Sequence, residues 1–255
     1  MKKNKIKLFE FIILIVLLTY FILSTFCCGL FFKNKYTNEN FTFYYNEIEK
    51  YNLINSDKNN LENYFEELSR KLKLNPFYKN EKKIKLLICD NYALYTFLSN
   101  INYKSIGITK TFGNYGFIVF NKTDFNTKEV ISQNKKNNVR SFESVVLHES
   151  THVFITKIHS LFNRFYLPSW KEEGICESIA SESSYDIEKG LKNFLSDKSE
   201  KSPSYKYFLY RLSVLYMKNQ EKLSYEKIIN DKRNQNEILS TIKIIPYEEI
   251  EAWFY

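Results

Sequence analysis

One short segment carries the residue types of a metal centre: His148-Glu149-Ser150-Thr151-His152. Two histidines at positions i and i+4 of a helix lie one above the other on the same face, so both rings can bind one metal ion. The glutamate between them reaches a metal-bound water and can accept its proton. Zinc is the expected metal, because nitrogen and oxygen ligands in an open tetrahedral site suit it. The alternative is a helix with two unrelated histidines.

A helix must position these side chains, and the sequence predicts one from Ser141 to Ile158 with Ser141 as its N-cap. A catalytic zinc site also needs a third protein ligand beside an open position. The metzincin arrangement would place a third histidine six residues after His152, with a glycine between. Ile158 and Ile155 occupy those positions, so this arrangement is excluded. His159, the remaining histidine, is expected to be exposed at the end of the helix.

A second helix is expected within Leu167–Ala180, and it contains Trp170, Glu173 and Gly174. Here the sequence resembles the gluzincin metallopeptidases of the peptidase MA-like family, which carry H-E-x-x-H followed by W-x-x-E-G on the next helix. The resemblance implies that Glu173 is the third zinc ligand. The adjacent Glu172 is offset by about 100° on a helix and is the weaker candidate.

The resemblance also assigns supporting roles. Glu177, one turn after Glu173, is expected to accept a hydrogen bond from a ligand histidine and so orient it, unless it is a solvated surface residue. A second group that stabilises the reacting carbonyl oxygen is expected to be a tyrosine, and Tyr205 and Tyr207 are the candidates. Cys176, between ligand positions, is expected to pack in the core.

A zinc metallopeptidase is the function that the resemblance implies, with a peptide or protein as substrate. Glu149 would be the general base for a zinc-activated water that attacks the peptide carbonyl. The strand expected at Tyr115–Phe120 could bind an extended peptide by strand addition beside the zinc, or could be a plain core strand. The alternative function is a non-catalytic zinc-binding or assembly protein on the same scaffold. The presence of Glu149 argues against it, because such a protein has no need of a base.

An α+β, zincin-like fold is expected, with a mixed sheet and helices in the N-terminal part and a mainly helical C-terminal half. The residue patterns behind this expectation predict strands at 41–45, 83–90 and 113–121, helices at 61–74, 91–100, 141–158 and 170–180, and a polar loop at 126–138. The family resemblance implies a further, aromatic-rich helix at 205–217.

The N-terminal region has the pattern of a membrane anchor. Residues 11–32 carry no formal charge, and four lysines precede them. A helix of about 20 apolar residues spans a bilayer, and the lysines favour a cytoplasmic N-terminus. We therefore expect a cytoplasmic tail and transmembrane helix in residues 1–35 and one extracytoplasmic catalytic domain in residues 36–255. The predicted localisation is the cell membrane with a single pass, and the alternative is secretion after cleavage.

The net charge of +8 is not evidence for nucleic-acid binding. Residues 1–35 hold six lysines against Glu10 and contribute +5 of this charge, which leaves +3 for residues 36–255. That value is ordinary for a protein surface, and no nucleic-acid motif is present. Outside the N-terminal segment only Cys89 and Cys176 remain, and they can form one disulfide or be two buried thiols.

Overall fold

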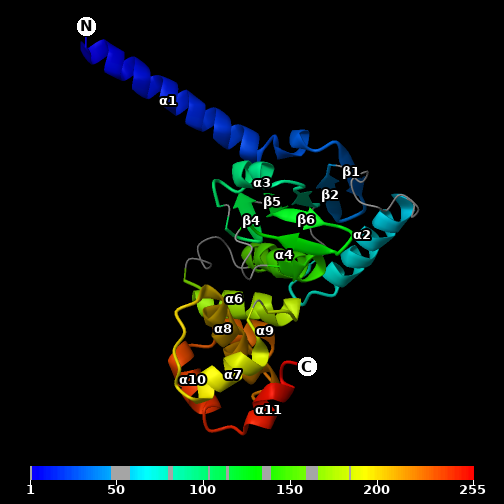
Figure 1. The fold of residues 1–255 in the computed structure, drawn as a ribbon, viewed down its shortest axis with the longest axis vertical. Coiled ribbons are helices and arrows are strands. Elements are labelled where there is room, and N and C mark those ends of the chain that lie inside the picture. The colour runs from blue at the N-terminus through cyan, green and yellow to red at the C-terminus, as the bar shows by residue number, and fades with distance from the viewer. Residues whose placement is uncertain are drawn as a thin grey trace.

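The structure is a computed structural model of the chain. It describes residues 2–46, 58–79, 83–102, 104–112, 115–133, 139–158, 166–183 and 185–255. Figure 1 shows a sheet-containing part and a helical part, with the long helix α1 projecting from the former. The protein is α+β, and its main sheet is mixed.

The predicted transmembrane helix is wrong. Within the ranges given above, no helix combines the length and the apolar character that crossing a membrane requires. Helix α1 runs from Lys2 to Thr25, and the chain then turns into the 3-10 helix η1 (Cys28–Phe31), so residues 11–32 do not form one helix. The uncharged part of α1, from residue 11 to residue 25, is about 22 Å long at about 1.5 Å per residue, against about 30 Å for a bilayer core. The single-pass membrane localisation, which depended on this helix, is wrong as well.

The end of α1 instead packs on the rest of the protein. The hydroxyl of Tyr20 donates a hydrogen bond to the carbonyl oxygen of Phe97 (2.8 Å), and the two rings meet edge to face. Ser24 and Cys28 are fully buried at this junction.

The main sheet has five strands in the order β1-β2-β3-β5-β4. The three central strands β2, β3 and β5 run parallel to one another, whereas the edge strands β1 and β4 run antiparallel to them. The strands are β1 (Asn34–Thr37), β2 (Phe41–Tyr45), β3 (Ile84–Ile88), β4 (Gly107–Phe112) and β5 (Tyr115–Phe120).

The expectation that residues 115–120 add a peptide strand is corrected by this order. β5 is paired on both sides, with β3 and with β4, so its backbone groups are already used. β4 is the edge strand beside it. An exposed sheet edge is what strand addition requires.

Helices cover both faces of this sheet. Ile118 and Phe120 point to the face covered by α2 (Lys58–Lys73) and α4 (Phe142–Ile158), where Phe65 and Phe142 are buried with them. Leu87 and Val119 point to the other face, covered by α3 (Tyr92–Leu98) and η1. The alternation follows from the two-residue period of a strand.

A smaller antiparallel sheet precedes α4, and it corrects the predicted loop at 126–138. It consists of β6 (Lys122–Asp124), β7 (Glu129–Ile131) and β8 (Val139–Ser141), so residues 129–131 are strand rather than loop. Each strand is too short to show a clear alternating pattern in the sequence. Burial of Val130 in the common core stabilises β7. Residues 134–138 lie outside the described residues.

The C-terminal half is helical. Its helices are α6 (Ser169–Ala180), α7 (Ile187–Leu195), α8 (Pro203–Asn219), α9 (Tyr225–Asn230), α10 (Gln235–Ile242) and α11 (Tyr247–Ala252). α6 lies between α4 and α8 and packs on both (Figure 1). One buried hydrophobic cluster continues from the sheet through α4 and α6 to Phe254.

Candidate metal centre

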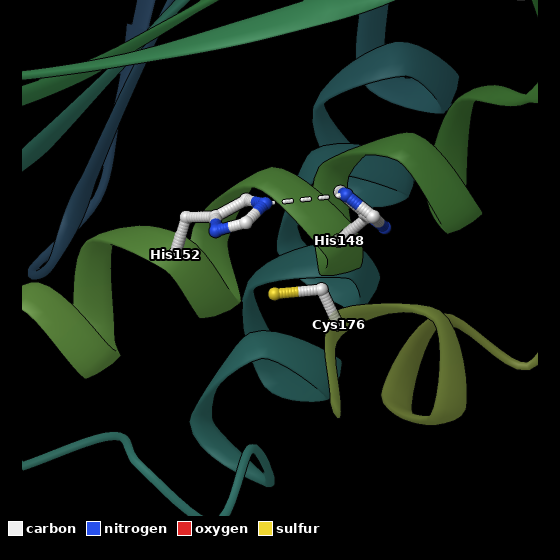
Figure 2. A group of neighbouring side chains, drawn as sticks. All are labelled: His148, His152 and Cys176. Atoms are coloured by element: carbon white, nitrogen blue, oxygen red, sulfur yellow. Dashed lines mark hydrogen bonds between the residues drawn. The ribbon is translucent and has the colours of Figure 1, made fainter. Parts of the chain in front are cut away.

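Helix α4 places His148 and His152 on one face, as their spacing predicts. The helix begins after Ser141, whose hydroxyl accepts a hydrogen bond from the backbone N–H of Ser144 (3.2 Å), which confirms the predicted N-cap. Both histidines are 8% exposed. Their Nε2 atoms lie 3.3 Å apart, so both rings point to the same place (Figure 2).

Helix α6 adds Glu173 to this pair. Its Oε2 atom lies 3.3 Å from Nε2 of His148 and 3.4 Å from Nε2 of His152. Burial acts to raise the pKa of Glu173, but the two histidines outweigh burial and hold the pKa well below its ordinary value. Glu173 is therefore an ionised carboxylate that faces both rings.

Cys176 also belongs to this cluster. His148, His152 and Cys176 are buried, and their ligand atoms lie within 4.8 Å of one another, so the three could hold a metal ion (Figure 2). Burial raises the pKa of the Cys176 thiol to about 12. A thiol must lose its proton to bind a metal. Glu173, by contrast, is already ionised, and its Oε2 atom lies 3.3 and 3.4 Å from the two Nε2 atoms.

Two further carboxylates of α6 contact the far side of the histidine rings. Glu172 Oε1 accepts a hydrogen bond from Nδ1 of His152 (2.7 Å), and Glu177 Oε1 lies 3.1 Å from Nδ1 of His148. Such contacts at Nδ1 orient the ring and leave Nε2 for a metal. The structure thus places Glu177 beside His148, but the Nδ1 atom of His148 makes no hydrogen bond of regular geometry to any described residue. The role of Glu172 was missed, and its only sequence signal is the doubled glutamate at 172–173.

The carboxylates also change the protonation of the rings. Burial acts to lower the pKa of His152, but Cys176, Glu172 and Glu173 around it raise the pKa well above its ordinary value. For His148 burial is likewise outweighed, by Glu173 and Glu177, and its pKa is raised. A metal ion must replace the protons on these rings, so metal affinity should increase with pH.

Glu149, the residue after His148 in α4, is held by the edge strand β4. The hydroxyl of Thr109 donates to Oε2 of Glu149 (2.7 Å) and also to its backbone oxygen (2.9 Å). Gly107 leaves the necessary room, because a Cβ there would lie 2.9 Å from Cγ of Glu149. These contacts fix the carboxylate against β4.

Gly174 lets α6 approach α8 closely. A Cβ at this position would lie 2.4 Å from the backbone oxygen of Tyr210. At an open helical position, replacing glycine by alanine stabilises by about 0.5–1 kcal/mol. Here Gly174→Ala should instead destabilise by about 1–3 kcal/mol, because the backbone of α8 must move. Urea unfolding measures the change.

Gly116→Ala is the control for this substitution. Its Cβ would meet Cγ1 of Val153 at 2.9 Å, which is a side chain that can shift. A Gly174→Ala protein as stable as the unmodified protein would contradict the close contact between α6 and α8.

The two candidate tyrosines are placed differently. Tyr207 is half-buried, and its pKa is raised to about 12 by burial first and by Glu173 next. Tyr207 lines a cavity of about 730 Å³ together with Glu173. Tyr205 lines the same cavity, but its ring packs in the core against Tyr185 and Phe208. Burial raises the pKa of Tyr205, and Tyr185 and Glu200 raise it further. The two histidines and Glu173 are not among the causes.

Two other sequence expectations concern single residues. Cys89 and Cys176 are both buried free thiols, so they form no disulfide with each other. His159 lies outside the described residues.

No family model matches this sequence, and no curated protein matches it. The candidate metal centre and its surroundings therefore carry the functional argument.

Proposed function

We propose that the protein is a zinc-dependent metallopeptidase of the gluzincin type that hydrolyses peptide bonds. One observation carries the proposal: Nε2 of His148, Nε2 of His152 and Oε2 of Glu173 form a triangle with sides of 3.3, 3.3 and 3.4 Å. The three atoms come from the H-E-x-x-H helix and from the helix of the W-x-x-E-G segment, as the resemblance implies.

This triangle has the dimensions of a zinc site. Nitrogen and oxygen ligands lie about 2.0–2.1 Å from tetrahedral zinc, which places two ligands about 3.3–3.4 Å apart. Three protein ligands leave the fourth position open, as in catalytic rather than structural sites. When bound, zinc would supply a water of lowered pKa and polarise a carbonyl oxygen.

Glu149 is the general base in this proposal. It directly follows His148 in α4 and is not one of the three converging atoms, and Thr109 hydrogen-bonds its Oε2 atom (2.7 Å). This leaves Oε1 to accept the proton of the attacking water and to return it to the leaving amine. A base that accepts and then returns a proton must be held by a group that is not itself a metal ligand. Thr109 of the strand β4 holds Glu149 in this way.

The edge strand β4 is suited to align an extended peptide. It carries Thr109, which contacts Glu149, so a peptide paired with β4 would pass the base and the metal ligands. Backbone hydrogen bonds would supply much of the affinity, with little dependence on the substrate sequence.

Tyr207 is the proposed donor to the carbonyl oxygen of the substrate. Tyr207→Phe should lower kcat by about 10²-fold, which is the lower end of the cost of losing such a donor. Because burial and Glu173 raise the pKa of Tyr207 to about 12, its hydroxyl keeps its proton below about pH 11. If the rate of hydrolysis falls at alkaline pH below about pH 11, deprotonation of Tyr207 should therefore not be the cause.

Tyr205→Phe is the matched control for this prediction, since its ring packs in the core away from the histidines. Equal kcat values for Tyr207→Phe and Tyr205→Phe would contradict the assignment of Tyr207.

The direct test of the function uses the full chain. Metal analysis after purification should find one zinc per chain, and the protein should cleave unfolded casein. A chelator should abolish cleavage, and added Zn²⁺ should restore it. A chain that binds zinc but cleaves nothing would favour the non-catalytic zinc-binding alternative, and a chain that binds no zinc would contradict both functions.

A further inference from the structure

Arg140 links the two helices of the metal centre. It lies in β8, just before α4, and is buried (7% exposed). Its Nη1 donates to Oε1 of Glu177 (2.8 Å), and its Nη2 donates to Oγ of Ser144 (2.8 Å) and to the backbone oxygen of Glu182 (2.9 Å). One guanidinium therefore joins the start of α4 to the second half of α6 and to Glu182, just after α6 ends.

Glu177 connects Arg140 to a ligand histidine. The same oxygen that accepts from Arg140 lies 3.1 Å from Nδ1 of His148, whose Nε2 faces Glu173. Burial acts to raise the pKa of Glu177, but His148 and Arg140 outweigh it and keep the pKa below its ordinary value. Contacts therefore run from Arg140 in β8 through Glu177 to His148 of the proposed metal centre.

A buried carboxylate needs such a partner. Glu177 is 3% exposed, and an unpaired charge at that depth is strongly destabilising. A second buried guanidinium, Arg211 of α8, also acts on the charge of Glu177. Arg140 hydrogen-bonds Glu177 directly, and its planar fork reaches Glu177, Ser144 and Glu182 at once, which an ammonium group does not do.

We infer that Arg140 is a positioning residue of the metal centre: it holds Glu177 against His148 and α6 against α4, and thereby sets the affinity for the metal. This inference rests on the proposed zinc site. It assigns Arg140 no contact with the metal or the substrate.

Zinc affinity is the measurement that tests this role. Competition with a chromophoric chelator, at fixed pH and well below the unfolding temperature, gives the Kd for Zn²⁺ of the full-length protein. Arg140→Met should raise this Kd by about 10–100-fold, as loss of a residue behind a metal ligand does. Arg233→Met is the matched control. Arg233 also forms salt bridges, with Glu221 and Asp231, but none with the metal-binding group, so its Kd should match that of the unmodified protein.

A double-mutant cycle separates positioning from general stabilisation. If Arg140 acts through Glu177, then Arg140→Met should change the Kd much less in a Glu177→Gln protein than in the unmodified one. The double variant also removes both charges of the buried pair, so it is less exposed to misfolding than either single variant. Should Arg140→Met not fold, Arg140→Lys takes its place in the cycle. It keeps the charge but lacks the fork, and it should shift the Kd in the same direction.

The outcomes differ for the inference and for the proposed function. An unchanged Kd in Arg140→Met, or equal effects of that substitution with and without Glu177→Gln, would overturn the positioning role while leaving the zinc site intact. Absence of zinc binding by the unmodified protein would overturn both.

Discussion

Replacing Glu149 by glutamine is expected to lower peptide hydrolysis by about 10²–10⁴-fold while zinc binding stays nearly unchanged. Glutamine has the shape of glutamate but cannot take a proton from water. The Glu149 carboxylate is not among the three converging ligand atoms, and Thr109 can still hydrogen-bond the amide oxygen. Hydrolysis of casein or of a quenched fluorescent peptide gives the rate, and chelator competition gives the zinc affinity.

Glu143→Gln is the matched control for this substitution. Glu143 lies in the first turn of the same helix and pairs with Lys71 (2.7 Å), away from the histidines. Its loss should leave the rate unchanged. If Glu149→Gln and the unmodified protein hydrolysed peptides at equal rates, Glu149 would not be the base.

Replacing Glu173 by alanine is expected to weaken zinc binding by more than about 100-fold, while Cys176→Ala changes it only slightly. The reason is the protonation and position of the two groups. Glu173 is ionised and lies 3.3 and 3.4 Å from the two Nε2 atoms, whereas burial raises the pKa of the Cys176 thiol to about 12. Loss of a residue behind a ligand lowers metal affinity by about 10–100-fold. Loss of the ligand itself should lower the affinity further.

This pair of variants distinguishes two possible metal centres. The two buried histidines approach both the partly exposed Glu173 and the buried Cys176, so a histidine–histidine–glutamate set and a histidine–histidine–cysteine set are both available. If Cys176→Ala lost zinc and Glu173→Ala kept it, the centre would be the cysteine-containing one, and the gluzincin proposal would be wrong. Isothermal titration of the metal-free proteins with Zn²⁺ measures both.

Local sequence was sufficient for several elements around the site. The predicted helix 141–158 and its Ser141 cap are confirmed, because a capping hydroxyl and an apolar pattern act within one or two turns. Two of the predicted strands, at 83–90 and 113–121, are confirmed as β3 and β5. Runs of β-branched and aromatic residues favour extended backbone locally.

Elements that depend on distant partners were missed. β4 was not predicted, although it pairs with β5 and holds Glu149, because its residues have no clear alternating pattern. The short strand β7 falls in a segment expected to be a loop. The transmembrane prediction was wrong because composition alone does not show that the helix ends at Thr25.

The sequence by itself determined that His148 and His152 share one helical face, because four residues is close to one helical turn. It also suggested Glu173 and Glu177 as partners. Only the tertiary structure decided which carboxylate meets which ring, with Glu172 on His152 and Glu177 on His148. Those contacts depend on how closely α6 packs against α4 and α8, and that distance is set by burial and by contacts between residues far apart in the chain.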